Sequence, residues 1–133
     1  MSTLIDVRLV EGPLPPSTAN AEAGTGAVWL FEGIVRPLEN NRPLVALEYE
    51  AYEPMTTQEL RRLADQISTD CNLLSIVVEH SIGRVAPGEC SFRLIVTSPH
   101  RAAGHQAAGK FIDMMKRHVP LWKNPIYSLS NRN

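Results

Sequence analysis

Two prolines, Pro99 and Pro120, delimit the segment that most constrains the fold. Ser98 can cap a helix, and Pro99 suits the first helical position, where no backbone donor is lost. The residue before Pro120 is pushed out of the α region, so the helix should end at Val119. The sequence therefore predicts a helix over about 99–119, with a buried stripe formed by Ala103, Ala107, Phe111, Met114 and Met115.

Most of the remaining chain has strand patterns. Apolar residues alternate or cluster in segments 3–10, 27–35, 44–52, 73–82, 89–98 and 126–129. Pro87-Gly88 is a turn signal, so the strands on either side of it should pair antiparallel. Gly33 should mark a bulge or a close backbone approach. Segments 12–26 and 37–43 are predicted to be loops, the second of them mobile.

A second helix should begin near Glu53-Pro54, because Pro54 fits a first helical position. Its buried face would be formed by Leu60, Leu63, Ala64, Ile67 and Cys71. Strands and two helices joined by short connections predict one α+β domain, with the helices packed on a mainly antiparallel sheet.

Composition narrows the class of protein further. The chain has 133 residues, of which 44% are hydrophobic, enough for one domain with its own core. No run is long enough to span a membrane, and the N-terminus lacks a signal-peptide pattern, so a soluble, cytoplasmic protein is expected. Cys71 and Cys90 are interpreted as small buried hydrophobes. His80, His105 and His118 are not spaced as ligands, so neither a metal nor a cofactor is expected.

Charge is distributed unevenly along the chain. Residues 1–90 hold six Lys or Arg and thirteen Asp or Glu, a balance of −7, whereas residues 91–133 hold seven and one, a balance of +6. An anionic ligand or an acidic partner is therefore expected at the C-terminal third. Binding to nucleic acid has little support, because the basic residues are scattered and few aromatic residues alternate with them.

The ends of the long helix carry the candidate chemistry. His100 and Arg101 put cations where the helix dipole favours anions, which suggests a bound anion such as phosphate. Lys116 lies in the last turn and Lys123 seven residues later, with Pro120 between them. This spacing permits a pair of lysines around the helix end, beside the apolar wall of Trp122. The alternative is that both lysines are solvated surface cations.

The motifs resemble, in order and at matching intervals, one known family: the large, catalytic subunit of molybdopterin synthase. The resemblance covers about residues 26–123 and rests on segments 31–36 (Phe-Glu-Gly-Ile-Val-Arg), 47–52 (Leu-Glu-Tyr-Glu-Ala-Tyr) with Met55, 80–83 (His-Ser-Ile-Gly), 87–89 (Pro-Gly-Glu), 98–101 (Ser-Pro-His-Arg), 111–116 (Phe-Ile-Asp-Met-Met-Lys) and 120–123 (Pro-Leu-Trp-Lys).

This resemblance implies an α/β hammerhead fold with an additional antiparallel sheet. It also implies an activity: sulfur transfer to cyclic pyranopterin monophosphate, which forms the dithiolene of molybdopterin. The donor would be the thiocarboxylated C-terminus of a small ubiquitin-like subunit, whose tail inserts into a pocket of the large subunit. Two large subunits would form the central homodimer of a heterotetramer.

The resemblance also assigns residues. Lys116 and Lys123 match the two active-site lysines. The expected contacts to substrate are Ile34, Val35, Arg36, His100, Arg101, Asn124 and Pro125, with Phe31 and Ile112 lining the pocket. The chain departs from the family at Asn124-Pro125, where charged residues are usual, and it ends at Asn133, where typical members continue with a polar tail that contributes to the neighbouring subunit's site.

A second hypothesis keeps the same basic surface but assigns it no chemistry. In this hypothesis the chain is a non-catalytic module that binds a ubiquitin-like partner or a phosphorylated ligand. Partner binding without turnover would distinguish it from the enzyme.

Overall fold

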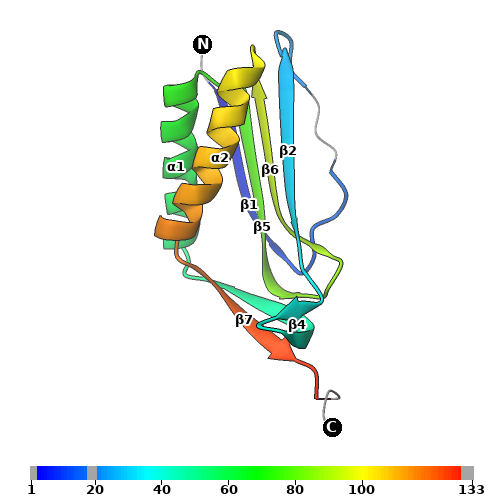
Figure 1. Ribbon diagram of the computed structural model, residues 1–133. Coiled ribbons are helices and arrows are strands. Elements are labelled where there is room, and N and C mark those ends of the chain that lie inside the picture. Colours follow the sequence, from blue (N-terminus) through cyan, green and yellow to red (C-terminus); the bar gives the residue numbers. More distant parts are fainter. Residues whose placement is uncertain (1–2, 18–20, 130–133) are drawn as a thin grey trace.

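A computed structural model describes residues 3–17 and 21–129, and it confirms the α+β class. The elements, in chain order, are β1 (Leu4–Glu11), β2 (Ala27–Ile34), β3 (Leu38–Glu39), β4 (Arg42–Ala51), α1 (Met55–Cys71), β5 (Ser75–Val85), β6 (Cys90–Ser98), α2 (Arg101–His118) and β7 (Leu121–Tyr127). Figure 1 shows both helices side by side on one face of a long sheet, with a smaller sheet at one end.

The long sheet has the strand order β2-β6-β5-β1. β5 and β6 pair antiparallel, as the turn signal predicted, and β2 pairs antiparallel with β6. Its register shifts between Gly33 and Ile34, which confirms the predicted irregularity at Gly33. β1 pairs with β5 in parallel, so the long sheet is mixed, with one parallel pair of strands.

β5 belongs to both sheets. Ser75 to His80 pair with β6, whereas Gly83 to Val85 pair with β4 in the small sheet, which β7 extends on β4. The change of direction falls at Gly83, whose φ of +81° is readily adopted only without a side chain. The two sheets are therefore joined by one continuous strand.

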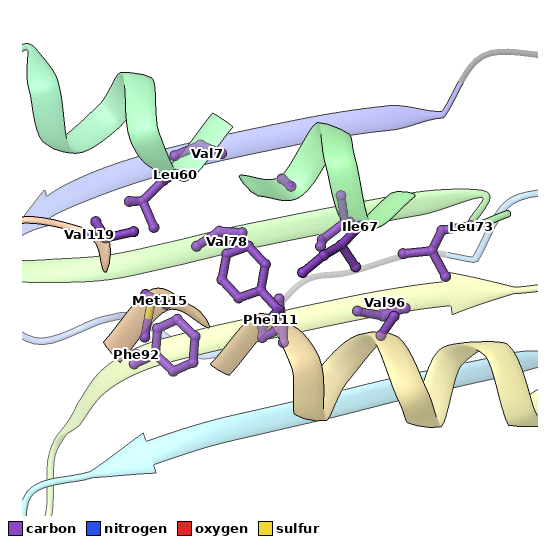
Figure 2. Packing of buried hydrophobic residues seen from close by; sticks show 14 residues of the cluster. Val7, Leu60, Ile67, Leu73, Val78, Phe92, Val96, Phe111, Met115 and Val119 are labelled. Carbon is purple, nitrogen blue, oxygen red and sulfur yellow. The ribbon is translucent and has the colours of Figure 1, made fainter. Parts of the chain in front are cut away.

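The main core lies between the helices and the long sheet. Figure 2 shows Phe111 of α2 beside Val78 of β5, with Leu60 and Ile67 of α1 nearby. The predicted stripe of α2 is correct at Ala107, Phe111 and Met115, but Ala103 and Met114 are only half-buried. Gly104 is buried in their place, because α2 approaches the Trp29 side chain of β2 so closely that a Cβ would overlap it.

Part of the opposite face of the long sheet is covered by the segment that follows β1, which contacts β6 at Cys90 and Arg93. Arg93 of β6 is only 2% exposed, and its guanidinium donates to Glu32 Oε2 at 2.7 Å and Glu79 Oε1 at 2.8 Å. It also donates to the Pro15 carbonyl at 2.6 Å. Every partner is an acceptor, so this buried cation is neutralised and hydrogen-bonded.

The long helix begins later than predicted. β6 continues through Ser98, whose hydroxyl donates to the His100 carbonyl at 2.6 Å, so Ser98 is a strand residue and does not cap α2. His100 occupies the N-cap position without a capping hydrogen bond from its side chain, and Pro99 precedes it. The predicted end is confirmed, since Val119 is extended before Pro120. Similarly, α1 begins at Met55, with Pro54 in the N-cap position.

Three other expectations are corrected. Segment 37–43 is a β-hairpin: Asn40 and Asn41 form a two-residue turn with φ of 54° and 63°, and β3 pairs with the start of β4. The last strand is not 126–129 but β7, because extended pairing with β4 resumes directly after Pro120. Cys71 and Cys90 are free but only half-buried, since both lie where their elements end or begin.

Candidate anion-binding cavity

A cavity of about 450 Å³ opens where the C-terminal end of α2 meets the small sheet. In Figure 1 this is the lower end of the helical layer, above β4 and β7. β2 supplies one wall with Phe31 and Gly33, and α2 supplies another with Ile112 and Met115. Val119, Leu121 and Trp122 add apolar surface along the chain that leaves the helix.

Three basic residues from separate parts of the chain line this cavity. Arg36 follows the end of β2, Lys116 lies in the last turn of α2, and Lys123 lies on β7. Pro120 breaks the helix and returns the chain as a strand along β4, which brings Lys123 back to the helix end. All three side chains are exposed, so the cations can meet a ligand from solvent.

The end of β2 is fixed by backbone hydrogen bonds. The Val35 N–H donates to the Glu89 carbonyl at 3.0 Å, and the Val35 carbonyl accepts from the Gly88 N–H at 2.8 Å. The Val35 side chain is buried in a second core cluster with Leu44 and Val85. Ile34 and Val35 both line the cavity, but both backbone groups of Val35 are already hydrogen-bonded, so for a ligand Val35 offers only the second lone pair of its carbonyl oxygen, as an acceptor.

The floor of the cavity is formed by polar and aromatic residues that sequence reasoning did not select. Tyr49 Oη donates to Ser91 Oγ at 3.0 Å, and the His80 ring packs edge-on against Tyr49 with centroids 5.1 Å apart. His80 Nδ1 donates to the Ser81 carbonyl at 2.7 Å. Burial lowers the pKa of His80 below its ordinary value, so its imidazole is neutral near pH 7. His80 is part of one of the motifs that carry the resemblance, but its position in the sequence gave no sign that it would lie at this cavity.

Glu39, on the β3–β4 hairpin, also lines the cavity. Its Oε2 lies 3.3 Å from Lys123 Nζ, and the side chains are 18% and 50% exposed, respectively. Among the cavity-lining residues in the described part of the chain, Glu39 is the one carboxylate, against three basic side chains. A mobile loop, as predicted from sequence, could not have indicated this ion pair.

The remaining predicted site residues lie outside the cavity of the same chain. His100 and Arg101 are exposed at the start of α2, and the rise of the helix separates them from Lys116 by about 22–24 Å along its axis. Asn124 and Pro125 continue β7 beyond Lys123, where Asn124 Nδ2 donates to Glu50 Oε1 at 3.2 Å. The two ends of α2 therefore do not converge within one chain.

Within residues 3–17 and 21–129, no group of three or more His, Cys, Asp or Glu side chains is arranged to hold a metal ion. Neither α1 nor α2 is long and apolar enough to cross a membrane. The arrangement of cations on apolar walls is instead suited to an anion attached to a flat, partly apolar molecule.

Comparison with known proteins decides the family. A sequence model of the MoaE protein family matches residues 10–118. The chain belongs to the MoaE family. The human molybdopterin synthase catalytic subunit is 39% identical over 106 residues, which cover 80% of this chain and 56% of that protein. The catalytic subunit of Bacillus subtilis (strain 168) is 39% identical over 102 residues, which cover 77% and 65% of the two chains. This MoaE-family chain thus spans between about half and two thirds of these relatives.

Solved structures share this fold. Molybdopterin synthase from Staphylococcus aureus superposes with a TM-score of 0.83 at 28% identity, covering 92% of this chain and 91% of that chain. One chain in a complex of subunits 1 and 2 of the molybdopterin-converting factor from Helicobacter pylori has a TM-score of 0.71 at 21% identity, covering 96% and 92%. The fold expected from the resemblance is confirmed.

Proposed function

We propose that this MoaE-family chain is the catalytic subunit of a molybdopterin synthase. It transfers sulfur from the C-terminal thiocarboxylate of a small ubiquitin-like subunit to cyclic pyranopterin monophosphate, and so forms the molybdopterin dithiolene. The observation that carries the proposal is the meeting of Arg36, Lys116 and Lys123 in one cavity of about 450 Å³. The phosphate and the carrier tail are both anionic, and the pterin ring suits the apolar walls.

The proposed chemistry follows from where charge develops. A dithiolene holds two sulfurs, so two carriers must react in turn. One sulfur attacks a carbonyl-derived carbon of the substrate, whose oxygen leaves as water, and the other replaces the phosphate oxygen on the neighbouring carbon, which opens the cyclic phosphate. The carrier's acyl–sulfur bond is broken by water, so the carrier ends as a carboxylate. These steps, including the opening of the cyclic phosphate, build negative charge on oxygen. A preorganised donor typically stabilises such charge by ~3–4 kcal/mol.

Roles are assigned to the cations by position. Lys116 is the principal acid, base or electrostatic group, and an amine there can also act as a nucleophile. Lys123 orients the thiocarboxylate and substrate, and Arg36 holds the phosphate with its planar fork. Ile34 and the Val35 carbonyl offer backbone contacts, while Phe31 and Ile112 contact the pterin. Asn124 and Pro125 lie one and two residues beyond Lys123, on the path for the tail.

His100 and Arg101 are assigned to the cavity of a second copy, in a homodimer at the centre of a heterotetramer. Within the described residues, β2 pairs on one side only, with β6. Its other edge is unpaired among the described strands, and Val28, Leu30 and Ile34 of this strand are 50–53% exposed, which gives an apolar surface suited to burial against a partner.

The two ends of β2 support this assignment. The first end adjoins the start of α2, because Trp29 Nε1 donates to the Arg101 carbonyl at 3.2 Å. The second end leads to Arg36 at the cavity. A two-fold axis beside β2 would set the first end of one copy against the second end of the other. His100 and Arg101 would then complete the partner's anion site.

The test is an assay of dithiolene formation with the thiocarboxylated carrier. Lys116→Ala should lower the rate by about 10²–10³, the usual effect of removing a preorganised charge-stabilising group. Lys110→Ala is the matched control, because Lys110 is an exposed lysine of the same helix outside the cavity. A folded Lys116→Ala protein that converts as fast as the unmutated chain would contradict the enzyme. Carrier binding without turnover would favour a non-catalytic module.

A further inference from the structure

Glu39 is held in place by a hairpin that is itself clamped to β7. Asn40 Nδ2 donates to Tyr127 Oη at 3.0 Å, and the Arg42 guanidinium carbon lies 3.8 Å from the centroid of the Tyr127 ring. The Leu44 N–H closes the base of the hairpin on the Pro37 carbonyl at 2.9 Å. The strand that carries Lys123 therefore also anchors the segment that carries Glu39.

This clamp brings a carboxylate to the basic cavity before any ligand arrives. Glu39 Oε2 is 3.3 Å from Lys123 Nζ, while Arg36 and Lys116 have no ion-pair partner among the described residues. The Glu39 side chain is mostly buried at 18% exposure, whereas Lys123 is half exposed. Lys123 is thus fixed from the protein side and remains accessible from the cavity.

We infer that Glu39 is a positioning residue that holds the Lys123 ammonium at the cavity rim and competes there with the anionic group of the ligand. Two negative groups near one ammonium repel each other, so an entering phosphate or thiocarboxylate must share Lys123 or displace Glu39. The carboxylate therefore weakens anion binding while keeping Lys123 in its working position. The inference rests on the proposed function only for the chemical identity of the anion.

The first experiment measures binding of inorganic pyrophosphate by calorimetry at fixed ionic strength. Glu39→Gln should bind it about two- to fivefold more tightly, the range expected for one partly exposed ion pair. Glu39→Asp keeps the charge and should restore affinity near that of the unmutated protein. Glu59→Gln is the matched control: Glu59 also forms a partly exposed ion pair, with Arg62 on α1, away from the cavity, and its loss should leave the affinity unchanged.

A second comparison shows whether the effect passes through Lys123. In a Lys123→Gln background, Glu39→Gln should tighten binding less than it does in the otherwise unmutated protein, because Glu39 and the ligand no longer compete for the Lys123 ammonium. An equal gain in both backgrounds would mean that Glu39 acts only through net charge, and this would overturn the positioning role. If the single variant Glu39→Gln bound pyrophosphate no more tightly than the unmutated protein, Glu39 would not compete with the ligand.

The sulfur-transfer assay separates positioning from general structural damage. Glu39→Gln should lower both KM for the phosphorylated pterin and kcat, since the substrate meets less competition and Lys123 is less well oriented. A fall in kcat with unchanged KM contradicts the inference even if the chain is an active synthase. If the unmutated chain transfers no sulfur, the proposed function fails, and the pyrophosphate comparison still decides the role of Glu39.

Discussion

At the residue scale, the cavity combines basic side chains at its rim with one buried histidine, whose charge depends on burial. His80 is 7% exposed and donates through Nδ1 to the Ser81 carbonyl. Burial is the main cause of its lowered pKa, and the hydrogen bond opposes this effect only in part. The floor of the cavity is thus neutral near pH 7, and the positive charge is confined to the rim.

His80 should make stability depend on pH. As pH falls below about 6.5, the unfolded chain takes up a proton on this residue before the folded chain does, so the free energy of unfolding decreases. His80→Asn keeps a donor near the Nδ1 position but cannot titrate. Urea unfolding at pH 8 and at pH 5.5 should therefore show a smaller loss of stability for the variant. An equal loss in both proteins would contradict the burial argument.

At the element scale, α2 depends on one glycine for its contact with β2. A Cβ at Gly104 would overlap the Trp29 ring and lie 2.9 Å from Ser98 Oγ, whereas a Cβ at Gly109 would meet no atom within 4 Å. Both glycines belong to the same helix, yet only the first is buried. This close contact fixes α2 against β2, and the same helix carries Lys116 at its other end.

Alanine substitutions at these two glycines should therefore change the free energy of unfolding in opposite directions. Gly104→Ala should destabilise the protein by about 1–3 kcal/mol through overpacking against Trp29. Gly109→Ala should stabilise it by about 0.5–1 kcal/mol, because alanine loses less backbone entropy in an open helical position. Chemical denaturation of both variants checks the pair. Equal effects at the two positions would show that α2 can shift away from β2 at little cost.

Periodicity predicted the elements well where the apolar pattern was long. It placed α2, β5 and β6, because one face of each packs into the core. It missed the β3–β4 hairpin, since the turn residues Asn40 and Asn41 lack the glycine of the commonest hairpin signal. It missed most of β7 because Pro125 argues against a strand, although β7 pairs with β4 alone among the described strands and so tolerates it.

The cavity was predictable only in part. The seven-residue spacing of Lys116 and Lys123 around Pro120 permitted a pair, but it left solvated surface cations as an alternative. Arg36 was selected by resemblance alone, since a residue so far away in sequence shows no spacing signal for a shared site. Glu39 was missed because its position depends on a hairpin that was interpreted as a loop. Tyr49 was missed because the strand pattern gave no reason to single out one of its aromatic residues. Proximity here arises from strand pairing, which a linear pattern does not encode.

At the scale of the whole molecule, the separation of His100 from Lys116 makes the proposed assembly testable. If each site uses Lys116 of one copy and His100 of the other, a hybrid of two defective chains contains one intact site. If both residues served the same chain, no hybrid could be active. The 18-residue length of α2 rules out direct cooperation of the two side chains within one subunit.

Mixing subunits provides the measurement. Lys116→Ala and His100→Ala homodimers should each be impaired, and co-refolding them in equal amounts should restore about one quarter of the unmutated activity. Leu30→Arg, placed on the exposed face of β2, should abolish this restoration and halve the mass seen by light scattering. Inactive mixtures of correctly dimeric protein would contradict a shared site.

The bend of β5 at Gly83 also has a thermodynamic consequence. Because the same strand hydrogen-bonds to β6 before the bend and to β4 after it, neither sheet can lose its order while its neighbour keeps a complete set of backbone partners. Denaturation should therefore be cooperative across the entire domain, and the ligand pocket should disappear at the same denaturant concentration as the helical signal.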